Sequence, residues 1–271
     1  MRPFLLYSLL LILCLALVAC GTGSTTGTPV VANPSPYQPP ARSPTAVPRQ
    51  ATPSAAPSFT PDSLPVSTVH PLQEGAEPVV ELCSPLSEHA LAELPEIVSD
   101  PYKPPPMGSD ARHQGVDFSY YRRGERTSIL GVGVQSVFAG RAVASIPDSF
   151  PYGNMVIVET LASDLPQNLA EQLGIEEGES LYTLYAHLGA TPLVALGEAV
   201  TACQTLGEVG KSGNAGVPHL HLEMRIGPEN RQLASMAFYS TQTTQQERDN
   251  YVLWRMSGVF RHFDPMSVLA P

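Results

Sequence analysis

The feature that most constrains the fold is a long segment, residues 21–75, that offers no pattern on which a core could be built. It contains twelve prolines, fifteen serines or threonines and only four charged residues, and its apolar residues follow neither helical nor strand periodicity. Such a composition buries too little apolar surface to offset the conformational entropy lost on folding. We therefore expect residues 20–75 to be a disordered linker and residues 76–271 to form the folded domain.

An export signal is predicted before this linker. Arg2 precedes an apolar stretch, Phe4–Val18, which is shorter than a membrane span of roughly 20 residues but suits a signal peptide. The stretch ends in Leu-Val-Ala-Cys-Gly and resembles the bacterial lipoprotein signal, in which the chain is cut before the cysteine and a lipid joins its sulfur. We predict a signal peptide at residues 1–19, lipidation of Cys20 and an exported, membrane-anchored protein. Ordinary secretion with a chance cysteine at the cleavage site is the alternative.

The charge of the chain excludes one class of partner. The formal net charge is −10, with 15 basic residues against 25 acidic ones. Binding to a phosphate backbone requires clustered positive charge, which a chain this acidic lacks. No nucleic-acid partner is expected.

Two cysteines remain once the signal peptide and the lipidation site are set aside. They are Cys83 and Cys203. An exported domain sits in a compartment where disulfides persist. These two residues are therefore expected either to form a disulfide with each other or to be two buried free thiols.

Strand patterns dominate the rest of the chain. Short apolar or alternating runs separated by glycines predict strands over 128–138, 141–146, 154–160, 181–188 and 219–226, with 154–160 half-buried. Helices are predicted at Asp164–Leu173, which has an early proline and Gly174 just past its end, and around residues 246–255. The expected fold is mainly β, an antiparallel sheet or sandwich with short helical insertions.

Histidines carry the chemistry that the sequence suggests. His113 and Asp117 are four residues apart, and the Gly-Val between them disfavours a helix, so they would meet across a bend. His219 and His221 alternate in a strand-like run, where side chains two apart point to the same face. Two imidazoles and one carboxylate, with a fourth position for water, form the ligand set of a catalytic zinc. Taken singly, each pattern also fits a solvated pair or a simple hydrogen bond.

Further motifs set these histidines in a wider pattern. In chain order they are Arg112-His-Gln-Gly-Val-Asp-Phe118, Tyr152-Gly-Asn154, Leu184-Tyr-Ala-His-Leu188, Gly210-Lys-Ser-Gly-Asn-Ala-Gly-Val-Pro-His-Leu-His-Leu-Glu223 and Phe263-Asp-Pro265. This set resembles the lysostaphin-type (LytM-like) zinc metallopeptidases, which are peptidoglycan endopeptidases. The resemblance covers a motif core at residues 110–227 and the Asp-Pro near the end of the chain.

The resemblance implies a role for each of five side chains. His113, Asp117 and His221 would bind one zinc ion, and His187 and His219 would be an uncoordinated catalytic pair. Zinc held by one carboxylate and two neutral imidazoles keeps a positive charge, which acidifies bound water. Two further histidines can take the proton of that water and stabilise the oxyanion formed at the scissile carbonyl.

Other residues near these motifs have two interpretations each. Glu223 lies on the same strand face as the two histidines before it, so it either orients an imidazole or forms a surface salt bridge. Asn154 either lines the cleft or forms a turn, and Lys211–Asn214 is predicted to be a turn that positions the His-x-His strand. Three further segments are candidates to border the cleft: residues 119–131, residues 161–180 and the region around Trp254.

The function predicted from the sequence is that of a cell-surface lipoprotein with a zinc-dependent endopeptidase domain. Its partners would be the stem or bridge peptides of peptidoglycan and, through Cys20, the membrane. The alternative is an inactive LytM-like scaffold that binds and activates a cell-wall amidase. The sequence does not specify which peptide bond is cut.

Overall fold

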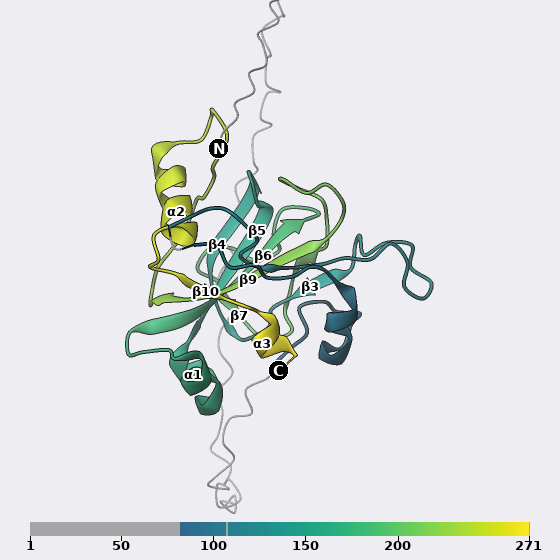
Figure 1. The fold of residues 1–271 in the computed structure, drawn as a ribbon, viewed down its shortest axis with the longest axis horizontal. Coiled ribbons are helices and arrows are strands. Elements are labelled where there is room, and N and C mark those ends of the chain that lie inside the picture. The colour runs from purple at the N-terminus through teal and green to yellow at the C-terminus, as the bar shows by residue number, and fades with distance from the viewer. Residues whose placement is uncertain (1–81, 107, 271) are drawn as a thin grey trace, which may run out of the picture. The chain divides into compact units, whose positions relative to one another are not determined.

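The computed structural model describes residues 82–106 and 108–270, so the predicted signal peptide, Cys20 and the linker lie outside the described residues. Its centre is an antiparallel sheet with the strand order β1-β2-β9-β6-β5-β4-β7, to which β10 adds by pairing with β9 (Figure 1). The strands of this sheet are β1 (Val98–Asp100), β2 (Val116–Phe118), β4 (Gly140–Ser149), β5 (Gly153–Leu161), β6 (Glu179–Leu188), β7 (Ala199–Val200), β9 (Leu220–Pro228) and β10 (Arg261–Phe263). A second sheet pairs β3 (Gly133–Gln135) with β8 (Thr205–Glu208). The mainly β fold expected from the sequence is confirmed.

Both faces of the central strands are covered. In β5, Val156 and Val158 belong to one apolar cluster, whereas Met155 and Ile157 belong to a second cluster. Successive side chains of a strand point to opposite faces, so the two clusters lie on the two sides of the sheet. The prediction of a half-buried strand over residues 154–160 is therefore wrong, because β5 is buried from Met155 to Thr160.

The helical predictions match the structure closely. Gln167–Leu173 forms α1, which ends at Gly174 with a φ of +64°, a left-handed conformation that glycine adopts without strain. A 3-10 turn, η2 (Ala162–Asp164), stands in front of it, and two other short helical elements are η1 (Leu91–Ile97) and α3 (Met266–Leu269). Gln245–Arg255 forms α2, which begins with a capping box between Thr244 and Glu247.

One strand is shorter than predicted. Of residues 128–138, only Gly133–Gln135 are extended and paired. The apolar residues around them, among them Ile129, Val132 and Val137, are buried from irregular backbone. An apolar run indicates that its residues are buried, but it does not show that they form a strand. Here most of them are buried without doing so.

The structure pairs Cys83 with Cys203 in a disulfide with a Cα–Cα distance of 5.3 Å. The bond joins the segment before η1 to the connection between β7 and β8, across 120 residues of sequence. Backbone hydrogen bonds hold both cysteines: the amide of Cys83 donates to Val137 and that of Cys203 to Ser136. Of the two alternatives for these residues, the structure contains the disulfide.

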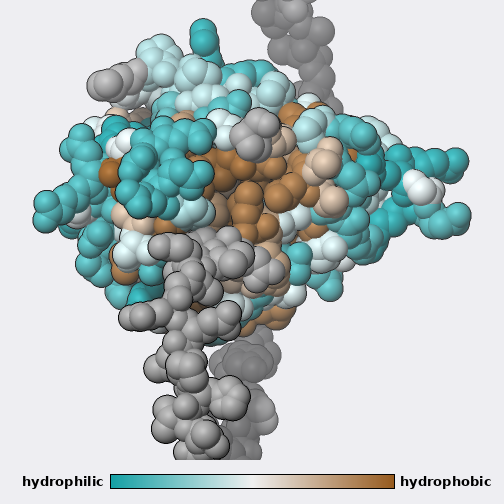
Figure 2. All heavy atoms as spheres, turned by 90° about the horizontal axis from the view of Figure 1, so that it is seen from below, coloured by the Kyte–Doolittle hydropathy of each residue, from teal (hydrophilic) through white to brown (hydrophobic). Residues whose placement is uncertain are grey.

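The surface of the described part is mixed in character. Figure 2 shows an apolar area in the middle of one face, with hydrophilic residues on either side of it. Among the described residues, no helix is both long enough and apolar enough to span a membrane.

Candidate metal centre and active-site cleft

Three predicted ligands converge where β2 meets β9. Asp117 and His221 are direct partners across these two strands, and His113 lies on the bend that leads into β2. His113 Nε2 is 3.0 Å from Asp117 Oδ1 and 3.0 Å from His221 Nδ1, and the third edge of the triangle, from His221 Nδ1 to Asp117 Oδ1, is 2.8 Å. Tetrahedral zinc with bonds of about 2.0–2.1 Å holds its ligand atoms about 3.3 Å apart. The donor set and its size therefore fit zinc.

The second nitrogen of each ligand imidazole has a partner outside the triangle. His113 Nδ1 donates to the carbonyl of Pro101 at 3.1 Å, and His221 Nε2 donates to Glu223 Oε1 at 3.0 Å. In the neutral rings these bonds fix the tautomers, so that His113 Nε2 and His221 Nδ1 can present their lone pairs to a metal ion beside Asp117. Such outer hydrogen bonds orient metal-binding histidines and raise their basicity.

The charges around the triangle favour a cation within it. Burial would raise the pKa of Asp117, but hydrogen bonds from His113 and His221 outweigh it and hold that pKa well below its usual range. Burial would lower the pKa of His221, but the hydrogen bonds to Asp117 and Glu223 outweigh it and raise the pKa to about 9. Two carboxylates thus stabilise positive charge at this point, whether a proton or a metal ion carries it.

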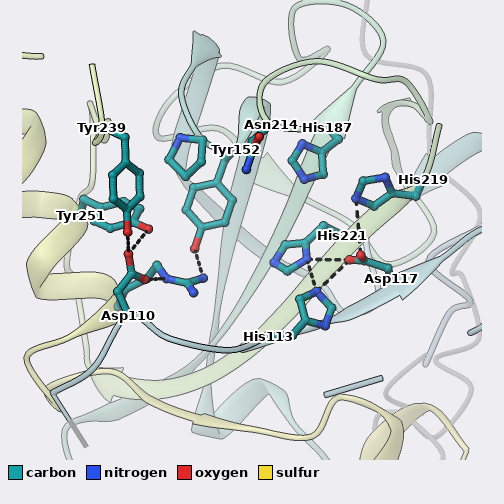
Figure 3. A pocket seen from close by; sticks show the side chains of 12 residues that line it. Asp110, His113, Asp117, Tyr152, His187, Asn214, His219, His221, Tyr239 and Tyr251 are labelled. Atoms are coloured by element: carbon teal, nitrogen blue, oxygen red, sulfur yellow. Dashed lines mark hydrogen bonds and ion pairs between the residues drawn. The ribbon is translucent and has the colours of Figure 1, made fainter. Parts of the chain in front are cut away.

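The predicted catalytic pair lies beside the triangle (Figure 3). The rings of His187 and His219 are 4.6 Å apart between centroids. His187 Nδ1 donates to the carbonyl of Ser212 and His219 Nδ1 to that of Val217, both at 2.9 Å, so the Nε2 atom of each ring is left for chemistry. His219 Nε2 lies 3.6 Å from Asp117 Oδ2.

His187 is a neutral base in this setting. Burial lowers its pKa to about 3, and the neighbouring His221 and His219 add to the effect. Its φ is +62°, a conformation that costs free energy in a residue other than glycine and that clusters at functional sites. Its backbone amide donates to the carbonyl of Tyr152 at 2.9 Å, which holds the strained residue in place.

Side-chain hydrogen bonds from Ser212 and Asn154 hold the end of β6 at which His187 lies. Ser212 Oγ donates to the Leu188 carbonyl at 2.8 Å, and Asn154 Nδ2 donates to the same carbonyl at 3.0 Å. The Asn154 oxygen accepts from the amide of Asp148 at 2.9 Å, so Asn154 braces a turn and is not among the residues that line the cleft. The turn over Lys211–Asn214 holds His187 directly, through Ser212, which the sequence analysis did not foresee.

Glu223 is completely buried, so the surface salt bridge considered for it is excluded. Burial would raise its pKa, but Arg225, His221 and Arg255 outweigh it and hold the pKa well below its usual range. Five side chains donate to its two oxygens: Tyr152 Oη at 2.7 Å, His221 Nε2 at 3.0 Å, Arg225 Nη2 at 2.6 Å, Trp254 Nε1 at 2.9 Å and Arg255 Nη1 at 3.1 Å. Its carboxylate joins the His221 ring to α2.

One protein-family model matches the part of the chain that holds this site. Residues 111–234, a little under half of the chain, match the model of peptidase family M23. The chain contains an M23 peptidase domain. The matched region includes the three ligand candidates and both catalytic candidates.

Solved structures similar to this chain include other peptidases. The catalytic domain of the antimicrobial peptidase lysostaphin from Staphylococcus simulans is 21% identical, with a TM-score of 0.39, and the match covers 68% of this chain and 99% of that one. A mutant catalytic domain of the prophage-encoded M23 protein EnpA from Enterococcus faecalis is 22% identical, with a TM-score of 0.34 and coverages of 50% and 85%. A zinc containing peptidase from Vibrio cholerae is 22% identical, with a TM-score of 0.33 and coverages of 49% and 34%. Among curated proteins, none matches the chain.

The cleft of the M23 domain has a volume of about 320 Å³. Figure 3 shows the ligand triangle and the histidine pair toward one end, a second group of side chains at the other, and Tyr152 between them. The lining residues are Asp110, His113, Asp117, Pro151, Tyr152, His187, Asn214, His219, His221, Tyr239, Tyr251 and Arg255. Neither residues 119–131 nor residues 161–180 contribute to this lining, so the expectation that these insertions border the cleft is not met.

The second group of side chains lies at the outer end of the cleft and was predicted only in part: the region around Trp254 borders the cleft as expected, through Tyr251 and Arg255, whereas Asp110 and Tyr239 were not expected there. Asp110 accepts hydrogen bonds from the Tyr239 hydroxyl, from the Tyr251 hydroxyl at 2.9 Å and from Arg255 Nε. Tyr251 and Arg255 are four residues apart on α2 and therefore share one face of the helix. In the sequence, the only indication of this group was the four-residue spacing of Tyr251 and Arg255 in the helix predicted around Trp254. No sequence pattern indicated that Asp110 or Tyr239 would line the cleft.

Proposed function

We propose that this protein is a zinc-dependent endopeptidase that hydrolyses peptide cross-bridges of bacterial peptidoglycan. The proposal is carried by one observation, the triangle of His113, Asp117 and His221 with its outer hydrogen bonds. Beside it lie two histidines whose Nδ1 atoms are bound to backbone carbonyls and whose Nε2 atoms are not. The M23 match supports a peptidase, and the resemblance of the motif set to lysostaphin-type enzymes supports the wall substrate.

The side chains divide the chemistry between them. A zinc ion bound by His113, Asp117 and His221 would supply a Lewis acid and an acidified water molecule. His187 Nε2 accepts a proton from the attacking water while its Nδ1 stays hydrogen-bonded to Ser212. The protonated ring can then pass that proton to the leaving amine. His219 Nε2 lies 3.6 Å from Asp117 Oδ2, and an Nε2–H of this ring can donate a hydrogen bond to the oxyanion of the scissile carbonyl.

An inactive scaffold that activates a cell-wall amidase is a weaker alternative. Such a scaffold is expected to have lost some metal ligands. In this chain all three ligand positions hold metal-binding side chains, and both catalytic positions hold histidine. No feature of the described residues favours the scaffold.

Tethering at the cell surface is the second part of the proposal. It rests on the sequence of residues 1–20 alone, in which the apolar stretch ends at Cys20. A diacylated cysteine at that position would anchor the domain, and the linker would let the domain reach the wall. Cys20→Ala should release the protein from membranes. Continued membrane association of the variant would instead indicate an uncleaved anchor.

Digestion of purified sacculi tests the enzymatic part directly. Protein loaded with zinc should hold about one zinc ion per chain and should release cross-bridge products that mass spectrometry of the muropeptides identifies. His187→Ala should keep the metal and lose hydrolysis, because the proposed role of His187 is proton transfer. Absence of zinc under non-chelating conditions, or unchanged hydrolysis by the variant, would contradict the proposal.

A further inference from the structure

The outer end of the cleft is built from residues that the family match does not include. Asp110, Tyr239, Tyr251 and Arg255 all lie outside residues 111–234 yet line the same cleft as the metal-ligand triangle. Figure 3 shows this group facing the histidines across Tyr152. The family match therefore does not describe the outer end, and the chemistry of these residues indicates what the chain accepts there.

Tyr239 makes a hydrogen bond and two ring contacts although most of the residue is exposed. The residue is 63% exposed, its φ is +62°, and its hydroxyl donates to Asp110. Its ring packs edge-to-face on Phe238, with 4.7 Å between centroids, and on Tyr251, with 6.1 Å between centroids. The side chain has lost conformational freedom and adopts a costly backbone conformation without burying much surface. A fixed, exposed ring of this kind is preorganised to contact a ligand.

The charges at the outer end are already paired. Arg255 is the only lysine or arginine among the residues that line the cleft, and it is bound to both Asp110 and Glu223. Asp110 in turn accepts from two tyrosines as well as from Arg255. A ligand carboxylate placed here would face Asp110 with no uncommitted cation to neutralise it. Aromatic ring faces and hydroxyl groups suit an uncharged segment of peptide.

We propose that Tyr239 is a specificity-determining residue whose exposed ring, anchored by Asp110, binds an uncharged segment of the peptide substrate. The inference rests on the proposed function, because it takes the scissile bond to lie at the metal end of the same cleft. Tyr239 holds the flanking segment in line with His187 and takes no part in proton transfer. Its contribution is therefore to substrate affinity.

Steady-state kinetics test this role. The substrates are cross-linked muropeptide dimers, which are released from purified sacculi by cleaving the glycan strands. In the zinc-loaded full chain, Tyr239→Ala should raise KM about tenfold, a loss of about 1.4 kcal/mol, and leave kcat within about threefold. Tyr239→Phe keeps the ring and should raise KM less than about threefold. Tyr121→Ala removes a tyrosine that is 80% exposed and does not line the cleft, so it should leave both constants unchanged. An unchanged KM in Tyr239→Ala, or a loss confined to kcat, would overturn the proposal.

Binding measured without turnover separates this inference from the proposed function. In the zinc-loaded His187→Ala background, calorimetry with the same dimers should show Tyr239→Ala weakening binding by the factor found for KM. Dimers whose carboxyl groups have been amidated should bind more tightly than untreated dimers, and Asp110→Asn should reduce that preference. If the wild type releases no products, the proposed function fails while these binding data still decide the role of Tyr239. Equal binding by the Tyr239 variants would refute the subsite.

Discussion

Glu223 Oε1 lies 3.0 Å from His221 Nε2, on the side of the imidazole that faces away from Asp117. The same oxygen accepts from Arg255 on α2, and the other carboxylate oxygen accepts from Trp254 on that helix and from Arg225. One buried carboxylate therefore orients a metal-ligand candidate and ties helix α2 to it. Metal binding and the stability of this part of the domain should depend on the same residue.

Glu223→Gln should weaken zinc binding and destabilise the domain together. Loss of the charged acceptor behind a metal-binding histidine typically costs 10- to 100-fold in metal affinity. The substitution also leaves Arg225, which is completely buried, without its counter-charge, a change that costs about 3–5 kcal/mol. Competition with a chelator measures the first effect, and denaturant unfolding of the zinc-free protein measures the second. Glu177→Gln, at an exposed position, is the matched control, and equal zinc affinity in the two variants would contradict the prediction.

Two parts of the site were accessible from the sequence because each part has a local spacing. Alternation along a strand places His219 and His221 on one face, and the glycine after His113 allows the bend that brings it back to Asp117. The pairing that completes the site, Asp117 opposite His221, joins residues 104 apart and required the fold. The resemblance to a known family predicted that Asp117 and His221 share one metal site, whereas strand periodicity did not.

The hydrogen bonds at the outer end of the cleft could not be predicted for the same reason. The hydrogen bonds to Asp110 come from residues 129, 141 and 145 positions away, so no local pattern records them. The burial of β5 was misjudged for a related reason. Glu159 reads as a solvent-facing residue, but it is buried and accepts from Tyr182 and from the amide of Asn230, both at 2.7 Å. A buried polar side chain with its partners in place mimics an exposed one in the sequence.

Asp117→Asn should abolish zinc binding while leaving the fold intact. The substitution preserves the shape of the side chain but removes the carboxylate that faces both His113 and His221. Metal analysis after dialysis should fall from about one zinc per chain to near zero, and hydrolysis of sacculi should stop. Asp148→Asn is a matched control, because Asp148 is exposed, is absent from the cleft lining and has a φ of +44° that asparagine tolerates. Retention of zinc by Asp117→Asn would remove this carboxylate from the ligand set.

His187 should make the zinc-free domain sensitive to mild acid. Its pKa is about 3 in the folded protein against about 6.5 in the unfolded chain, so between these values the unfolded state binds the extra proton. The stability linked to His187 is present above pH 6.5 and is lost as the pH falls, by about 2 kcal/mol between pH 7 and pH 5. His187→Gln, which can still donate to the Ser212 carbonyl, should lack this loss. Denaturant unfolding at both pH values makes the comparison, and parallel losses in the two proteins would contradict the assigned pKa.

Replacing the disulfide should destabilise the domain through the unfolded state. The Cys83–Cys203 bond closes a loop of 120 residues, and the loss of chain entropy on closing a loop of that length corresponds to about 4–5 kcal/mol. Cys83→Ser combined with Cys203→Ser should lower the free energy of unfolding by up to this amount. The wild type treated with reductant should unfold like the double variant, while the variant itself should not respond to reductant. Alkylation without reductant should label neither cysteine in the native protein; label on both would show that the thiols are free, and the predicted stabilisation would then be absent.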